Sequence, residues 1–317
     1  MSIEPLPTDQ NSAGDPRLTG VEIELGGLSE ARVAEICAEV LGGEARQTDH
    51  AQWLVEGGNL GKLKVYLDTA LRDAAQTRLR DLALDFGREV VPVEIVTDPL
   101  DRAGLERLEA LVDRLRAAGA EGSGAGLVYG FGVHLNVQVK GETAEDIVPV
   151  LLAYALLEDW LRDAMPIDEA RRVLPFTDPY PTRFVRALAE AGTGAALETI
   201  MDLYAEHTPS RNRGLDMLPL FKHLNAGRIA PALNGATSAR PTYHFRLPDC
   251  RIDEAGWNIG TEWARWLAVE RVSEDADLLE RLRAGWLESH GAVTLDRTRW
   301  ARRAGEILED AGAEVLA

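Results

Sequence analysis

Residues 131–139, FGVHLNVQV, form the most regularly alternating segment of the chain. Apolar residues occupy the odd-numbered positions, and His134, Asn136 and Gln138 occupy the even-numbered positions between them. Successive side chains of a β-strand point to opposite faces of its sheet. The segment therefore predicts a strand with one face in the protein core and the other lined by imidazole and amide groups.

Other segments alternate in the same way, with charged or polar residues opposite a row of apolar ones. They are residues 20–25 (GVEIEL), 62–68 (KLKVYLD), 90–97 (VVPVEIVT) and 241–247 (PTYHFRL). A further strand at 51–56 is joined to 62–68 through Gly57, Gly58 and Asn59, a composition typical of a hairpin turn. Pro92 indicates an edge strand or a bulge.

Helical spacing of apolar residues predicts helices over 29–41 and 103–118. The region from 143 to 225 is mostly helical in pattern, and so is the chain after 253. Strands and helices do not alternate strictly, as they do in a doubly wound sheet. We therefore predict an α+β fold with an antiparallel or mixed sheet and helices on one side of it.

If these strands share one sheet, its polar face carries acids, imidazoles and an arginine. The residues are Glu22, Glu24, Asp68, Glu94, His134, Asn136, His244 and Arg246. Glutamates gathered on one surface repel each other unless a cation lies among them, and oxygen ligands favour magnesium or manganese. An arginine on the same face can bind a pair of phosphate oxygens.

Each of these residues alone has an ordinary structural explanation. A Glu-x-Glu strand is usually a solvated face, and His134 with Asn136 can be a simple hydrogen-bonded pair. Glu94 can protect an edge strand from aggregation, and Arg246 can pair with a neighbouring acid. The functional interpretation depends on all of them lying in strands of matching polarity.

The ordered motifs GVEIE, VEIVTDPL, FGVHLNV and RPTYHFRLPD, spread over residues 20–265, resemble the amidoligase family. This family belongs to the superfamily of carboxylate–amine ligases that includes glutamine synthetase and glutamate–cysteine ligase. The resemblance implies a glutamine-synthetase-like catalytic domain. Such a domain has a curved, largely antiparallel sheet with helices packed on one face, and it holds ATP and metal ions on its concave face.

The resemblance also implies roles for the polar residues. Metal ligands are expected at Glu22, Glu24, Glu94 and His244, nucleotide contacts at His134, Asn136 and Arg246, and catalytic roles at Glu24, Glu94 and Arg246. Asp68 lies where many relatives have an Asp-Gly-Ser turn, but Thr69 and Ala70 follow it here. His244 stands where relatives usually have glutamate. This difference leaves open the number and identity of the metal ions, and also a member that has lost catalysis.

Basic residues between the polar strands are candidates for holding the anionic ligands, above all the substrate carboxylate. They are Arg183, Arg186, Arg211, Arg213, Lys222 and Arg240. Lys222 and Arg240 are the preferred pair for binding the cofactor and substrate, because they lie close in sequence to the last strand.

The function implied by the resemblance is an ATP- and magnesium-dependent ligase, with manganese as a second possible ion. It would join an amino acid or peptide carboxylate to an amine through an acyl phosphate. The alternative is a catalytically degenerate member that binds a nucleotide or peptide. A metal-dependent hydrolase on an unrelated fold is disfavoured, because the chain has no His-Glu-x-x-His motif.

Composition sets the remaining expectations for this chain of 317 residues. Residues 1–19 are predicted to be a flexible arm, and residues 20–317 one ligase-like domain with a helical C-terminal part. Two isolated cysteines fit a reducing compartment, and no apolar stretch approaches the roughly 20 residues of a membrane span, so we expect a cytoplasmic protein. The net charge of −18 argues against nucleic-acid binding. Oligomerisation stays open.

Overall fold

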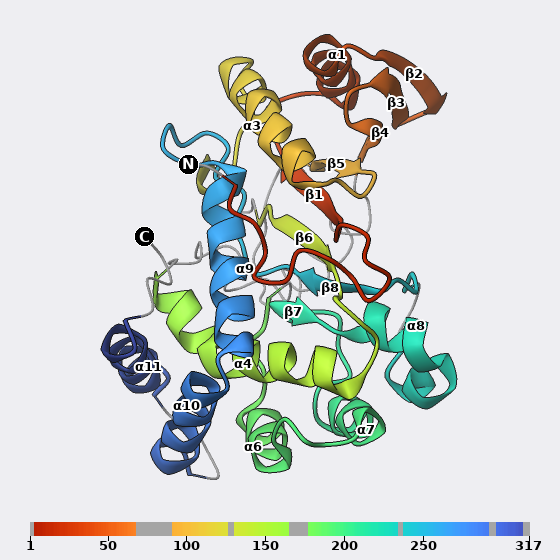
Figure 1. Ribbon diagram of the computed structural model, residues 1–317. Coiled ribbons are helices and arrows are strands. Elements are labelled where there is room, and N and C mark those ends of the chain that lie inside the picture. Colours follow the sequence, from red (N-terminus) through yellow and green to blue (C-terminus); the bar gives the residue numbers. More distant parts are fainter. Residues whose placement is uncertain are drawn as a thin grey trace, which may run out of the picture.

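The computed structural model describes residues 3–67, 91–125, 130–164, 177–233, 237–291 and 296–312. Eight strands of this part form one sheet in the order β2-β3-β4-β5-β1-β6-β8-β7, and every neighbouring pair is antiparallel (Figure 1). The strands are β1 (Thr19–Leu25), β2 (Glu44–Asp49), β3 (Gln52–Gly58), β4 (Gly61–Leu67), β5 (Val93–Thr97), β6 (Val133–Gln138), β7 (Leu215–Asp216) and β8 (Thr242–Phe245).

Helices pack against the apolar face of this sheet and against one another. They are α1 (Glu30–Leu41), α3 (Arg102–Ala117), α4 (Ala144–Ala164), α6 (Thr182–Ala191), α7 (Leu197–His207), α8 (Leu218–Ile229), α9 (Ile259–Glu274), α10 (Ala276–Ser289) and α11 (Thr298–Asp310). Figure 1 shows α1 with β2–β4 at one end of the molecule and α6 and α7 at the other. The α+β class and the antiparallel sheet are confirmed, whereas the sheet curvature and the glutamine-synthetase-like fold stay predictions.

The core lies between the sheet and these helices because the alternation of β1, β6 and β8 turns their apolar residues to the same side. Trp266 of α9 is fully buried, and its ring centroid lies 5.3 Å from that of Tyr243 and 5.5 Å from that of Phe245. Tyr154 of α4 meets Phe245 edge to face. These rings pack against the apolar face of β8. His244, which lies between Tyr243 and Phe245 in the strand, therefore points to the opposite face of the sheet.

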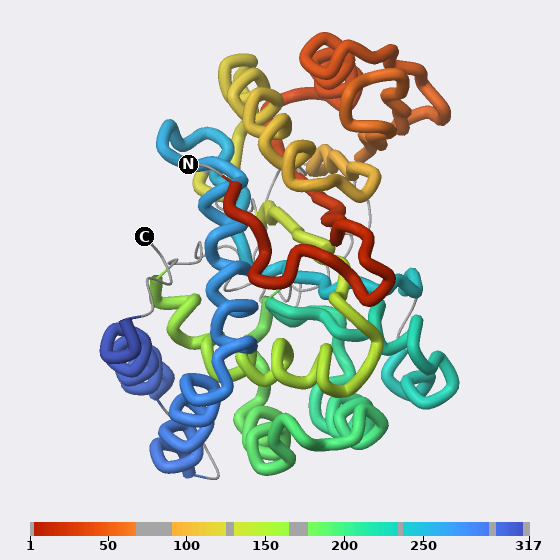
Figure 2. Tube along the Cα trace, viewed as in Figure 1, coloured from red at the N-terminus to blue at the C-terminus, as the bar shows by residue number. Residues whose placement is uncertain are grey.

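The N-terminal segment, which we expected to be a flexible arm, lies against the domain. Figure 2 shows it in red, passing beside α9 before it enters β1. Ile3 is buried, and Trp263 of α9 donates a hydrogen bond to the Glu4 carbonyl. Arg17 donates to both carboxylate oxygens of Glu270 at 2.8 and 2.7 Å. The domain boundary at residue 19 stays a prediction.

The structure differs from the sequence-based expectation in three strands. β2 and β7 were not predicted, and β5 is an interior strand between β4 and β1, so of the two interpretations of Pro92, an edge strand or a bulge, the edge strand is wrong. Pro92 directly precedes the first residue of β5, where its missing N–H removes no ladder hydrogen bond. Glu94 is therefore not an edge-protecting residue. Within the described residues, no helix has the length and apolar character that crossing a membrane requires.

Candidate functional site

The strand register brings the predicted polar residues together on one face of the sheet. Cross-strand partners share a face, and the register pairs Glu24 of β1 with Glu94 of β5, and Glu22 of β1 with His134 of β6. Asn136 of β6 is likewise opposite His244 of β8. Four adjacent strands thus contribute to one polar surface.

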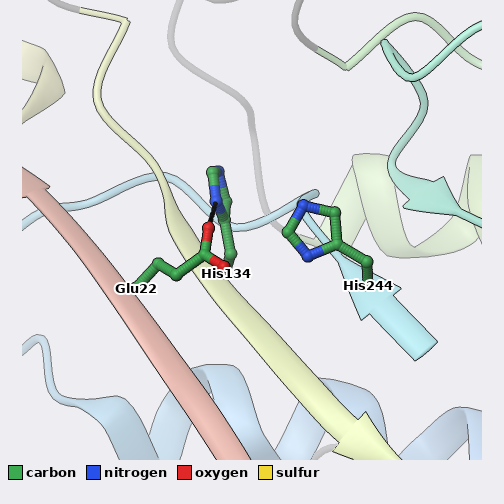
Figure 3. A group of neighbouring side chains, drawn as sticks. All are labelled: Glu22, His134 and His244. Atoms are coloured by element: carbon green, nitrogen blue, oxygen red, sulfur yellow. Dashed lines mark hydrogen bonds and ion pairs between the residues drawn. The ribbon is translucent and has the colours of Figure 1, made fainter. Parts of the chain in front are cut away.

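Hydrogen bonds join the central residues of this surface into a chain. His134 Nδ1 donates to Glu22 Oε2 at 2.8 Å (Figure 3), and Asn136 Nδ2 donates to Glu22 Oε1 at 2.8 Å. Asn136 Oδ1 is then left to face His244 Nδ1, 2.6 Å away. A carboxylate oxygen only accepts, so His134 carries a hydrogen on Nδ1, whereas His244 Nδ1 faces both the acceptor Asn136 Oδ1 and the donor Arg240 Nη2.

Arg240, one of the predicted basic residues, reaches this hydrogen-bonded chain. Its Nη2 lies 3.6 Å from Glu22 Oε1 and 3.2 Å from His244 Nδ1. The backbone N–H of Arg240 donates to the Pro219 carbonyl, which fixes the segment that leads into β8. Lys222, the other preferred residue, instead donates to the Thr237 carbonyl at 2.6 Å.

Two further carboxylates lie next to this hydrogen-bonded row of side chains. Glu24 and Glu94 are only 4% and 7% exposed. Glu24 Oε2 accepts from the Gly132 N–H at 2.7 Å, while Oε1 lies 3.8 Å from His134 Nε2. Two opposed, buried carboxylates repel each other unless a proton or a cation offsets their charge. Their oxygen-only chemistry fits magnesium.

Arg246 lies directly after β8, beside an acid that the sequence analysis missed. Arg246 Nη1 donates to the Arg211 carbonyl at 2.6 Å. Asp216 of β7 is fully buried; Oδ1 accepts from the Leu218 N–H at 3.0 Å, and Oδ2 lies 3.4 Å from Arg211 Nε. Burial raises the pKa of the Asp216 carboxyl, and the charges of Arg246 and Arg211 oppose this rise. A two-residue strand has no periodicity from which Asp216 could have been predicted.

Burial and charge set the protonation states of the central residues. Burial lowers the pKa of His244 well below its ordinary value; Glu22 opposes this effect, and Arg246 and Arg240 reinforce it. Burial also acts to raise the pKa of Glu22. The two imidazoles and Arg240 outweigh it, so this pKa lies well below its ordinary range. At neutral pH, the site therefore contains an ionised Glu22 beside a neutral His244.

The remaining candidates divide between structural contacts and positions away from the polar face. Arg213 donates to Thr208 Oγ1 and the Pro179 carbonyl, and Arg186 donates to the His290 and Gly291 carbonyls. Arg183 is exposed on α6. Asp68 lies outside the described residues.

One group in the described part of the chain has the spacing of a metal site. Glu22, His134 and His244 each offer a ligand atom, and these atoms lie within 4.8 Å of one another. The sequence analysis placed Glu22 and His244 among the metal ligands but gave His134 a nucleotide contact. Glu24 and Glu94 lie beside this group rather than within it.

The family profile described as "Putative amidoligase enzyme" matches residues 15–268. The chain belongs to the amidoligase family. The match runs from the end of the N-terminal segment into α9 and includes every residue of the polar surface, while α10 and α11 lie beyond it. No curated protein matches the sequence. Family membership supports an amide-bond-forming ligase and agrees with the resemblance drawn from the motifs.

Proposed function

We propose that this amidoligase uses ATP to join a carboxylate to an amine through an acyl phosphate. The observation that carries this proposal is the buried pair Glu24 and Glu94 on the face that also bears Glu22 and His134, with the guanidinium of Arg246 in electrostatic interaction with Glu24. The reaction brings two anions together, the substrate carboxylate and the γ-phosphate of ATP. It therefore needs acids that hold a cation and an arginine that holds phosphate.

In the first step, an oxygen of the substrate carboxylate would attack the γ-phosphorus of ATP while the bond to ADP breaks. Magnesium, when bound, would neutralise charge on the phosphates, with Glu24 and Glu94 as its protein ligands. Arg246 would bind oxygens of the transferring phosphoryl group. Its Nη1 donates to the Arg211 carbonyl at 2.6 Å, and its guanidinium interacts electrostatically with Asp216. Arg240, with a side chain 31% exposed, can take a second anion such as the substrate carboxylate.

In the second step, the amine would attack the carbonyl carbon of the acyl phosphate, and inorganic phosphate would leave. The acyl phosphate hydrolyses in water, so it must be shielded until the amine arrives. An amino acid or peptide acid fits a site in which Arg240 offers a second cationic group next to Glu22 and His244.

A degenerate member that binds a nucleotide or peptide without turnover is the second candidate. His244 favours it, because a neutral imidazole stands where relatives usually have a carboxylate. The two functions differ in a measurable way, since only a ligase releases phosphate in response to an acceptor.

Hydroxylamine trapping separates the two candidates. The full chain would be incubated with ATP, magnesium, hydroxylamine and pools of amino acids and short peptides. A ligase is expected to release phosphate only when a suitable amino acid or peptide is added, and to form a hydroxamate of that acid. Hydroxylamine attacks the acyl phosphate as an amine would. Glu94→Gln should abolish both products, and Glu35→Gln on the exposed face of α1 should leave both unchanged. Nucleotide binding without either product for every pool would favour the degenerate member.

A further inference from the structure

We propose that, in the ligase reaction on which this inference rests, the acid substrate is an extended acidic peptide that lies across β5, β4 and β3. The surface that would bind it is formed by Arg46 of β2, Leu54 of β3, Lys64 and Tyr66 of β4, and Val96 of β5. We call this surface the strand platform. None of its residues belongs to the groups proposed to hold ATP or a metal ion, so the platform would select the substrate and leave the chemistry to the catalytic face.

The strand register makes the strand platform continuous with the catalytic face. Val96 of β5 pairs with Glu22 of β1 on one side and with Lys64 of β4 on the other. The same row continues from Lys64 to Leu54 of β3, and from there to Arg46 of β2. Because cross-strand partners share a face of the sheet, a ligand held near Glu22 can extend over the platform without leaving that face.

The strand platform is open to solvent, whereas the catalytic face is buried. Lys64 is exposed, and Leu54 and Val96 are half-buried. α1 lies against the other side of these strands, where Val55 and Val65 are buried (Figure 1). A solvent-facing side that keeps apolar surface next to a cation suits a partner that brings both apolar and acidic groups.

The charge of the strand platform favours an acidic partner. The chain has a net charge of −18 and only four lysines, and two of these, Lys62 and Lys64, lie on β4. The Glu56 carboxylate lies 3.0 Å from the Lys62 ammonium and 3.5 Å from the Arg46 guanidinium, so it partly neutralises both. In the part of the chain that the structure describes, the Lys64 ammonium has no such salt bridge. Lys64 therefore offers an exposed positive charge to an incoming carboxylate.

The width of the strand platform sets the length of the peptide. Tyr66 of β4 pairs with Glu94 of β5, so the platform begins beside the carboxylate pair. Neighbouring strands lie about 4.8 Å apart, which puts Leu54 of β3 roughly 10 Å from β5, and an extended chain rises about 3.3 Å per residue. About three residues beyond the reacting carboxylate therefore reach Leu54. A free amino acid held at Glu94 does not.

Hexaglutamate labelled with fluorescein is the probe. Its fluorescence anisotropy would be titrated with the full chain in the absence of ATP and at low salt, because salt screens exposed charges. We expect saturable binding that unlabelled hexaglutamate competes away. Free glutamate at the same carboxylate concentration should not compete, and labelled hexaglutamine should bind more weakly. Equal binding of the two labelled peptides, or no binding of hexaglutamate by the folded protein, would overturn the inference.

Substitution of Lys64 locates the binding on the strand platform. Lys64→Ala should weaken hexaglutamate binding by about 2–5-fold, the range for one exposed ion pair. Lys64→Glu replaces an attraction with a repulsion of similar size and should weaken it by about 4–25-fold. The matched control is Lys140→Glu, which makes the same charge change after β6, where Lys140 pairs with Glu274 at 3.8 Å, and it should bind as wild type. Circular dichroism would establish that each variant is folded. Equal losses in Lys64→Glu and Lys140→Glu would overturn the inference, because the effect would then follow net charge alone.

Turnover distinguishes a failure of this inference from a failure of the ligase function. In the hydroxylamine assay, Lys64→Glu is expected to raise KM for an acidic peptide and to leave kcat unchanged, because Lys64 lies away from the reacting atoms. Lys64-dependent binding with no product from any pool would support the strand platform and count against the ligase function alone. Turnover of a free amino acid with a KM as low as that of any peptide, unchanged in Lys64→Glu, would keep the ligase function and overturn the inference.

Discussion

Replacing Arg246 with alanine is expected to lower the rate of phosphate release that depends on the carboxylate substrate by about 10²–10³-fold. This is the usual cost of losing one preorganised donor to a developing anion. Arg246 follows β8 directly, its Nη1 donates to the Arg211 carbonyl, and its guanidinium interacts electrostatically with the buried Asp216 carboxyl. A guanidinium fixed in this way needs little reorganisation when charge develops on the phosphoryl group. The rate would be measured in the hydroxylamine assay with the acid that gives the largest response.

Two further variants test whether the effect of Arg246→Ala depends on the geometry of this guanidinium. Arg246→Lys keeps the charge but loses the paired N–H geometry, so it should recover only part of the activity. Arg228→Ala removes an arginine on α8 that pairs with Asp202 at the surface, and it should behave as wild type. Full phosphate release by Arg246→Ala would exclude Arg246 from the reaction.

Replacing Arg17 with alanine is expected to lower the free energy of unfolding by about 3–5 kcal/mol, because Glu270 would be left as an unpaired buried charge. The Arg17 and Glu270 side chains are only 1% and 4% exposed. Arg17 Nε also donates to the Gln138 carbonyl at 2.7 Å, so one side chain joins the N-terminal segment, β6 and α9. Urea unfolding followed by circular dichroism would measure the loss.

The comparison pair for Arg17 is a salt bridge at the surface. Arg32 is 41% exposed and pairs with Glu35 on α1, so Arg32→Ala should cost at most about 1 kcal/mol. The double variant Arg17→Met with Glu270→Met removes both buried charges and should be more stable than Arg17→Ala alone. A loss below about 1 kcal/mol for Arg17→Ala would mean that water or another cation compensates Glu270.

Side-chain alternation was enough to predict the polar face. Glu22, His134 and His244 were each assigned to the same side of a strand, and the structure brings them within ligand distance. This succeeds because a strand fixes which face each residue occupies, whatever its neighbours are. The same rule placed Glu24 and Glu94 on that face.

Other features carry no such pattern. β2 reads EARQTD and is exposed except at the partly buried Ala45, so no apolar alternation marks it as a strand. β7 has two residues, too few for any period, and with it Asp216 escaped prediction. Lys222 was chosen for its nearness in sequence, but its ammonium contacts the Thr237 carbonyl. Contacts between distant segments depend on tertiary packing, which local pattern does not encode.

The polar face is proposed to bind ATP together with magnesium. Calorimetric titration of ATP into the protein, with and without magnesium, tests it most directly when repeated with Glu24→Ala and with Glu35→Ala as the surface control. The account predicts magnesium-dependent binding by wild type and Glu35→Ala, and its loss in Glu24→Ala. Equal magnesium-dependent binding by folded Glu24→Ala, or none by the folded wild type, would contradict it.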